Sequence, residues 1–295
     1  MSRVRAEIGG QMGESERVAI LGPEILARTM SVATARGKGS RKWQYHSRSD
    51  THSKVACWTL LFDLLTQCDV LHDAASKGKI GFGINHVIVG PINKTLDLVV
   101  TWRTRSGRSR RRSFADLAAA YGIVLTPYER LVLDRLPRVE EDRADDVSEV
   151  AIALEAKACM TEHVKSLPRL HAEILATGYL AKLAAKECIA VSYSLVNAAS
   201  RFVTPSPSAQ TNRHAQPADA RRVVRMLGTA IPTRASTPEY GYDAIGITVL
   251  DCRNDGTAVA VVHDPAIGPN RDEHTNYERM VRSLCAQFRA RFARS

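Results

Sequence analysis

The spacing of apolar and polar residues predicts several strands and helices. Segments 94–102 and 148–158 are apolar for most of their length, which is the pattern of buried strands. Other predicted strands are 80–89, 188–196, 244–250 and 257–262. Apolar residues recur at helical spacing in 54–75 and 272–294, and Ser166 and Pro168 begin a predicted helix over 166–186. The order of these elements predicts an α/β fold.

Segment 148–158 ends in two opposite charges. With period-two alternation, Val150, Ile152 and Leu154 share one face, and Glu155 and Lys157 project from the other. Removing such charges from water is costly unless they are paired or bind a ligand. An ion pair is the simplest interpretation, because a Glu-x-Lys triplet arises by chance about once in a few hundred residues.

A second acid makes a binding site the alternative interpretation. Asp97 lies on the polar face of strand 94–102, opposite an apolar face that includes Leu98 and Val100. Two strands that each present an acid can offer oxygen ligands to a hard divalent cation. A lysine two residues beyond the second acid can orient or activate a metal-bound water.

An Asp on one strand, Glu-x-Lys on a later strand and then an amphipathic helix resemble the PD-(D/E)XK nuclease superfamily, from about Val55 to Val196. The resemblance implies a restriction-endonuclease-like central mixed sheet flanked by helices, with a helical insertion. Two departures are Leu96, where the family pattern has proline, and the long gap between the two acids.

The resemblance also implies roles for individual residues. Asp97, Glu155 and the backbone carbonyl of Ala156 would hold Mg²⁺, and Lys157 would stabilise or activate the attacking water. The implied reaction is hydrolysis of a DNA phosphodiester that leaves a 5′-phosphate.

Charge points to a polyanionic partner. The chain of 295 residues has a formal net charge of +10 and a pI near 9.5, which favours nucleic acid or an acidic membrane. No segment is long and apolar enough to span a bilayer, and the start does not resemble a secretory signal, so a cytoplasmic protein is expected. The six scattered cysteines contain no C-x-x-C pair and are expected to be buried, reduced thiols.

Composition divides the chain into an arm and a domain. Residues 1–52 form a basic amino-terminal arm, and residues 53–295 form the nuclease domain. This domain carries a basic and helical insertion at about 103–149 and a polar, mobile loop at about 198–220. The acidic segment 140–149 is expected to be exposed, as is Asp63, although a helical acid could supply a third metal ligand.

The insertion begins with a dense run of arginines. Arginine suits phosphate because its planar fork can bind two oxygens, whereas a solvated loop is the alternative. His163 and Lys165, just beyond the charged strand end, are further candidates to contact phosphate. The candidate DNA-binding residues are Arg103, Arg105, Arg108, Arg110, Arg111, Arg112, His163 and Lys165.

The insertion continues with two predicted helices, 114–121 and 127–136. Ser113 with Asp116, and Thr126 with Glu129, match the capping-box pattern. The join at Gly122 resembles a helix-turn-helix, and a helical hairpin packed on the domain is the alternative.

The sequence therefore favours a magnesium-dependent DNA endonuclease, with a type II restriction enzyme acting on double-stranded DNA as the expected member. A homodimer would suit the cutting of both strands of a palindrome. No nucleotide-binding motif is evident. The alternatives are a non-catalytic DNA-binding regulator that uses 114–136, and a non-specific or structure-directed repair or defence nuclease.

Overall fold

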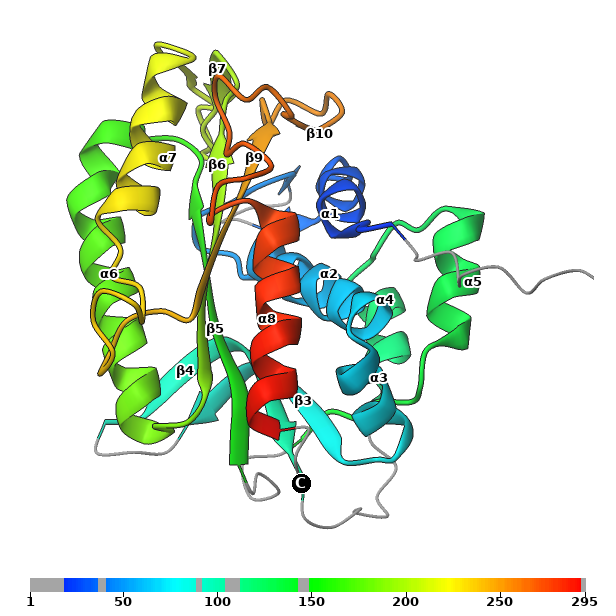
Figure 1. The fold of residues 1–295 in the computed structure, drawn as a ribbon. Helices are drawn as coiled ribbons and strands as arrows, with labels where there is room; N and C mark the ends of the chain where they lie inside the picture. The colour runs from blue at the N-terminus through cyan, green and yellow to red at the C-terminus, as the bar shows by residue number, and fades with distance from the viewer. Residues whose placement is uncertain (1–18, 37–40, 89–91, 104–111, 143–148, 293–295) are drawn as a thin grey trace, which may run out of the picture.

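A six-stranded mixed sheet forms the centre of the molecule (Figure 1). The computed structural model describes residues 19–36, 41–88, 92–103, 112–142 and 149–292. The strand order is β10-β9-β6-β5-β4-β3. The bounds are β3 Ile80–Ile88, β4 Lys94–Trp102, β5 Glu149–Cys159, β6 Ile189–Asn197, β9 Ala244–Asp251 and β10 Ala260–Val261. The predicted α/β class is confirmed.

The strand directions follow from the connections. β3, β4 and β5 form an antiparallel meander, whereas β5, β6 and β9 are parallel and β10 is antiparallel to β9. Parallel neighbours need crossover connections, which here contain α6 (His163–Ala184) and α7 (Ala218–Thr229). These two helices cover one face of the sheet, and α1 (Gly22–Met30), α2 (Thr51–Gln67) and α8 (Tyr277–Phe292) cover the other (Figure 1).

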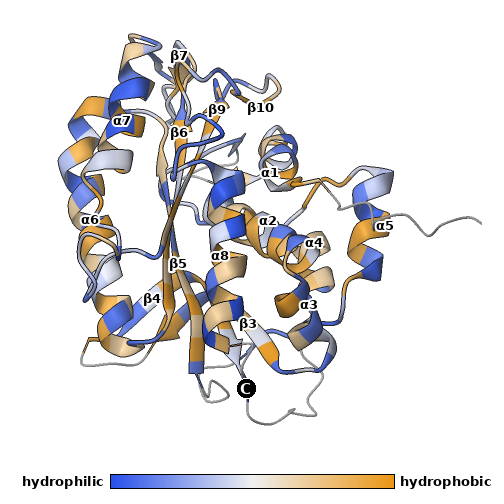
Figure 2. Cartoon of the chain, viewed as in Figure 1, coloured by the Kyte–Doolittle hydropathy of each residue, from blue (hydrophilic) through white to orange (hydrophobic). Residues whose placement is uncertain are grey.

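The apolar core lies between the sheet and its helices. Figure 2 shows that the central strands are largely hydrophobic, and the side chains of β6 are buried along its whole length. Helix α1, which lies within the segment expected to be an arm, contributes Ile25 and Leu26 to this core. Among the described residues, no helix has the length and apolar character needed to cross a bilayer.

The predicted helix 54–75 is two helices. α2 ends at Gln67, Cys68 has an extended backbone, and α3 (Asp69–Ser76) follows. Cys68 forms a disulfide with Cys285 of α8, so the prediction of reduced thiols was wrong for these two residues. The pairing joins residues 217 positions apart and leaves no signal in local spacing. The other four cysteines are free and buried.

A β-bulge turns the side chain of Val150 in β5 to the opposite face of the sheet. The register between β4 and β5 shifts beyond Val100, so β5 has one extra residue there. Val150 consequently packs with Ala153 on the α6 side, whereas Ile152 and Leu154 face the other core as predicted.

Asp63 is buried, which corrects the expectation of a solvated side chain. Its carboxylate accepts hydrogen bonds from the backbone N–H groups of Leu21 and Gly22, at 2.9 and 2.8 Å, and from the Tyr277 hydroxyl at 2.9 Å. It therefore fixes the start of α1 against α2 and α8. Burial raises the pKa of Asp63 to about 7, although these three donors oppose the shift.

The helical insertion packs on the domain. α4 (Phe114–Ala120) and α5 (Pro127–Arg135) each begin with the predicted capping box. The Trp58 indole donates a hydrogen bond to the carbonyl of Phe114 and stacks on its ring, with centroids 4.7 Å apart. Asp142 is buried in an ion pair with Arg103, which corrects the expected exposure of the acidic segment at this residue.

The segment 198–220, expected to be a polar loop, contains a hairpin. β7 (Arg201–Val203) pairs with β8 (Thr211–Arg213), and α7 begins at Ala218. A second short hairpin, β1 (Ala35–Arg36) with β2 (Lys42–Trp43), lies near α1 in the chain.

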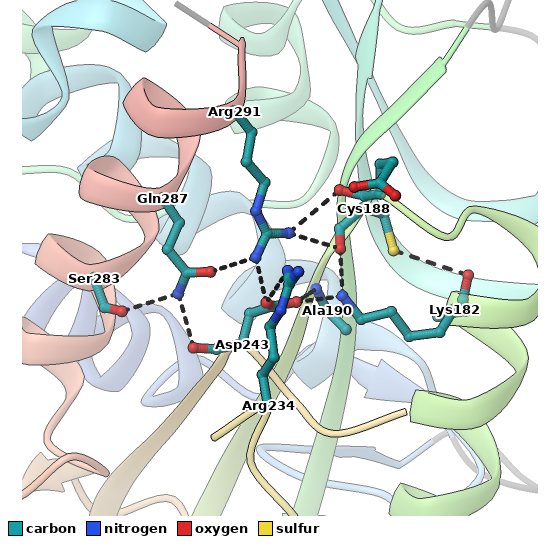
Figure 3. A network of polar contacts seen from close by, with 10 residues as sticks. Lys182, Cys188, Ala190, Arg234, Asp243, Ser283, Gln287 and Arg291 are labelled. Atoms are coloured by element: carbon teal, nitrogen blue, oxygen red, sulfur yellow. Dashed lines mark hydrogen bonds and ion pairs between the residues drawn. The ribbon is translucent and has the colours of Figure 1, made fainter. Parts of the chain in front are cut away.

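One buried carboxylate connects helices on opposite faces of the sheet (Figure 3). Asp243, just before β9, pairs with Lys182 of α6 and Arg291 of α8, and Arg234 lies 3.3 Å from it. The Ala190 N–H donates a fourth contact at 2.8 Å. Charge pairing outweighs burial and holds the pKa of Asp243 below its usual value, so the carboxylate stays ionised within this network.

Candidate active site

A cleft of about 710 Å³ lies beside the second half of β5. It is bounded by the start of β4, the end of β5, α6 and the segment before α2. The three predicted catalytic side chains, Asp97, Glu155 and Lys157, all line it. Asp97 lies on β4, and the other two lie two residues apart on β5. The strand pairing thus brings together the residues that the sequence proposed as one site.

Asp97 is fixed against the neighbouring strand. Its Oδ2 atom accepts a hydrogen bond from the Ala156 N–H at 2.8 Å. Burial, and then the charge of Glu155, raises the pKa of Asp97 to about 6, although Ala156, Lys157 and Ser53 oppose the shift. The Glu155 carboxylate therefore lies close enough to disfavour the charge of Asp97, which a bound cation would relieve.

Glu155, which is buried, and Lys157, which is half-buried, form an ion pair. The Lys157 Nζ atom lies 2.7 Å from Glu155 Oε1 and 3.2 Å from Glu173 Oε2. Lys94 approaches Glu155 from β4, at 3.5 Å. Burial disfavours the Lys157 ammonium, but the two carboxylates outweigh it and raise its pKa above the ordinary value. Lys157 is therefore a cation at neutral pH.

Glu173 is a site residue that the sequence reasoning missed. It lies on α6, four residues after Arg169, whose Nε atom is 3.9 Å from Glu173 Oε1. An Arg and a Glu spaced by four on the helix after the Glu-x-Lys strand were the available signal. Only the packing of α6 across the face of the sheet brings Arg169 and Glu173 to the cleft, and local spacing does not show that packing.

His52 and Tyr45 lie on the opposite wall. Their ring centroids are 4.8 Å apart, and both residues line the cleft. Burial lowers the pKa of His52 to about 4, with a further contribution from the Lys157 charge, so the ring is neutral at pH 7.

Two serines of β6 flank the charged residues. Ser192 and Ser194 pair in register with Glu155 and Lys157, so their side chains lie on the same face of the sheet. Both hydroxyls are buried and have no hydrogen-bond partner among the described residues. Buried hydroxyls of this kind are usually satisfied by ordered water.

The donor set suits magnesium. Mg²⁺ is commonly bound by one or two carboxylates, with water and substrate phosphate completing its coordination. Asp97 and Glu155 supply two carboxylates, and Ala156 between the charged residues of β5 supplies a carbonyl. Within the described residues, the only group of three metal-ligand side chains lies elsewhere, at Cys68, Asp69 and Cys285. Because two of these form the disulfide, that group offers no comparable site.

Two of the predicted DNA-binding residues, Arg103 and His163, make internal contacts instead. The Arg103 guanidinium is 9% exposed and donates to Asp142, with Nε 2.8 Å from Oδ1. His163 is buried, and its Nε2 atom hydrogen-bonds the Asn197 carbonyl at 2.6 Å. Both side chains are thus committed to internal contacts rather than to a ligand.

Other members of that set differ in position. Lys165 lines the cleft with its side chain 82% exposed. Arg112 is exposed and pairs with Glu141, away from the cleft lining. The remaining four, Arg105, Arg108, Arg110 and Arg111, lie outside the described residues. The cleft adds Arg48 and Arg169, both exposed cations that the predicted set did not include.

Comparisons with protein-family models, with curated proteins and with solved structures gave no match. Function is therefore inferred from the geometry of the cleft.

Proposed function

We propose that this protein is a magnesium-dependent DNA endonuclease with Asp97, Glu155 and Lys157 at its active site. The observation that carries the proposal is the convergence of these three side chains in one cleft. With α3, α4 and α5 as additions, the order α2, β3, β4, β5, α6, β6 supports the restriction-endonuclease-like core that the sequence resemblance implies.

The residues have distinct roles in this proposal. Asp97, Glu155 and the Ala156 carbonyl would hold Mg²⁺. When bound, the metal would lower the pKa of a water and neutralise charge on the scissile phosphate. Lys157 remains protonated and stabilises negative charge that develops at the phosphate. Because its pKa is raised, we assign it electrostatic stabilisation rather than removal of a proton.

The substrate is double-stranded DNA, as the net charge of +10 suggests. Arg48, Lys165 and Arg169 are the cleft cations that we assign to phosphates beside the scissile one. A sequence-specific restriction enzyme, acting as a homodimer, remains our preferred member of this class.

A cleavage assay with plasmid and unmethylated phage DNA, with and without Mg²⁺, tests the proposal. Lys157→Ala should reduce cutting by at least about a hundredfold while leaving DNA binding intact. Lys77→Ala serves as the matched control, because Lys77 is an exposed lysine directly after the end of α3. Equal cutting by wild type and Lys157→Ala would refute the assignment.

The products distinguish the remaining alternatives. Discrete fragments indicate a restriction enzyme, and a smear indicates a non-specific or structure-directed nuclease. Salt-sensitive DNA binding without metal and without any cutting would instead favour a DNA-binding regulator.

A further inference from the structure

The β7–β8 hairpin carries two arginines directly opposite each other. Arg201 and Arg213 are cross-strand partners, and both are exposed. Neither forms an ion pair with any residue in the described part of the chain. Like charges placed opposite each other destabilise a strand pair, by up to about 1 kcal/mol. The arrangement therefore favours an anion shared between the two guanidinium groups.

Phe202 shows the direction in which the Arg201 and Arg213 side chains project. Phe202 is fully buried, and its ring lies 6.2 Å from Tyr45 and 6.4 Å from His214. Because neighbouring side chains on a strand point to opposite faces, Arg201 and Arg213 project away from the core.

The hairpin packs beside the cleft. Phe202 packs on Tyr45, which lines one wall. The ring of His214, which directly follows β8, meets that of His163, with centroids 4.7 Å apart. His163 begins α6, and its chain neighbour Glu162 lines the other wall. The hairpin thus lies beside the cleft, with Arg201 and Arg213 on its face away from Tyr45.

Backbone contacts hold the hairpin in this position. The Val203 N–H donates to the Arg253 carbonyl at 2.9 Å, and the Asn254 side chain donates to the Val203 carbonyl at 2.8 Å. The His214 N–H donates to the Ser200 carbonyl at 2.9 Å. A hairpin closed at its base and anchored to residues 253–254 keeps the backbone of the two arginines in place before a ligand arrives, which lowers the entropic cost of binding.

We propose that Arg201 and Arg213 together bind a backbone phosphate of the DNA duplex outside the cleft. This proposal rests on the proposed nuclease function and identifies where the flanking duplex lies. Duplex DNA carries one charge per about 1.7 Å of its axis, so phosphates continue beyond the scissile one. Arginine forks bind phosphate bidentately, and two opposed forks can share one phosphate.

Salt dependence of binding tests the pair. Binding of a duplex oligonucleotide is measured in EDTA over a series of salt concentrations, with wild type and Arg201→Gln/Arg213→Gln. Each phosphate contact contributes about 0.9 to the slope of log affinity against log salt. We expect the slope to fall by about one, and the affinity to fall about tenfold or more.

The matched control is Arg130→Gln/Arg135→Gln. These two arginines of α5 are also exposed without an ion pair among the described residues, and the substitution removes the same charge. α5 lies on the opposite side of the molecule from α7 (Figure 1). A thermal melt verifies folding, and relief of the like-charge contact should leave the hairpin variant at least as stable as wild type.

Two results would overturn the inference. One is an unchanged slope in the hairpin variant, and the other is an equal fall in the α5 control, which would show that the effect is not specific to the hairpin. Wild-type cutting in Mg²⁺ is measured in parallel. Cutting with an unchanged slope refutes the hairpin site alone, whereas the absence of both cutting and DNA binding refutes the nuclease proposal as well.

Discussion

The Asp97 carboxylate accepts a hydrogen bond from the Ala156 amide at 2.8 Å. This contact joins the acid of β4 to the backbone between Glu155 and Lys157. Their relative placement is therefore set by strand pairing and does not depend on a flexible loop. Rigid elements of this kind hold reacting groups more accurately than loops do.

Asp97→Asn should stabilise the metal-free protein while abolishing cutting. Burial and Glu155 raise the pKa of Asp97 to about 6, so stability is lost as pH rises from about 4 through 6. Asparagine removes that loss and keeps an acceptor for the Ala156 amide. We expect a gain of about 1 to 3 kcal/mol at pH 8 and little gain at pH 4. Urea unfolding at both pH values measures it, and a loss of stability at pH 8 would contradict the prediction.

Glu173→Gln should lower the pKa of Lys157. Glu173 is one of the two carboxylates that favour the ammonium, and its removal leaves Glu155 as the remaining one of that pair. The alkaline limb of the cleavage pH profile should therefore shift to lower pH, and NMR titration of Lys157 should show the same direction. Glu162→Gln is the control, because Glu162 pairs with Lys165 instead. Coincident profiles for Glu173→Gln and wild type would exclude this positioning role.

Arg103→Ala should affect folding more than DNA binding. Asp142 is fully buried, and loss of the guanidinium removes its buried cationic partner. Breaking such a pair is expected to lower the free energy of unfolding by about 3 to 5 kcal/mol. Arg112→Ala, at an exposed pair with Glu141, should change it by less than about 1 kcal/mol. The reverse order in denaturant unfolding would be inconsistent with these contacts.

Asp63 should make stability fall with rising pH. Its folded pKa of about 7 lies above the ordinary value of 3.8, so the protonated form favours the folded state. That stabilisation is complete below about pH 4 and is lost as pH rises towards 7. Relative to Asp63→Asn, wild type should lose stability across this range. Tyr277→Phe, which removes a donor to the carboxylate, should steepen the loss. A constant difference between wild type and Asp63→Asn from pH 4 to 8 would show that the carboxylate does not titrate there.

Local patterns predicted most of the elements that form the cleft. Alternation along 94–102 and 148–158 put Asp97, Glu155 and Lys157 on polar faces, and the meander then placed the two strands side by side. Capping boxes at Ser113 and Thr126 fixed two helix starts, because both partners of each box lie within four residues.

Long-range contacts explain what the sequence could not predict. Tyr277 reaches Asp63 across 214 positions, and Asp142 pairs with Arg103 across 39. Asp63 has the spacing of an exposed helical acid, and Arg103 begins a run typical of a solvated loop. Their burial depends on which distant segments pack against them, and local periodicity carries no information on this long-range packing.

The insertion leaves the sheet at the end away from Asp97 and Glu155. Trp102 pairs with Glu149 at that end, whereas Asp97 lies five residues earlier, about 17 Å along the strand. The chemistry and the insertion are therefore mechanically separate. Evolution or an engineer could replace the segment between Arg103 and Arg112, or add a whole targeting domain there, without resetting the geometry of the acids.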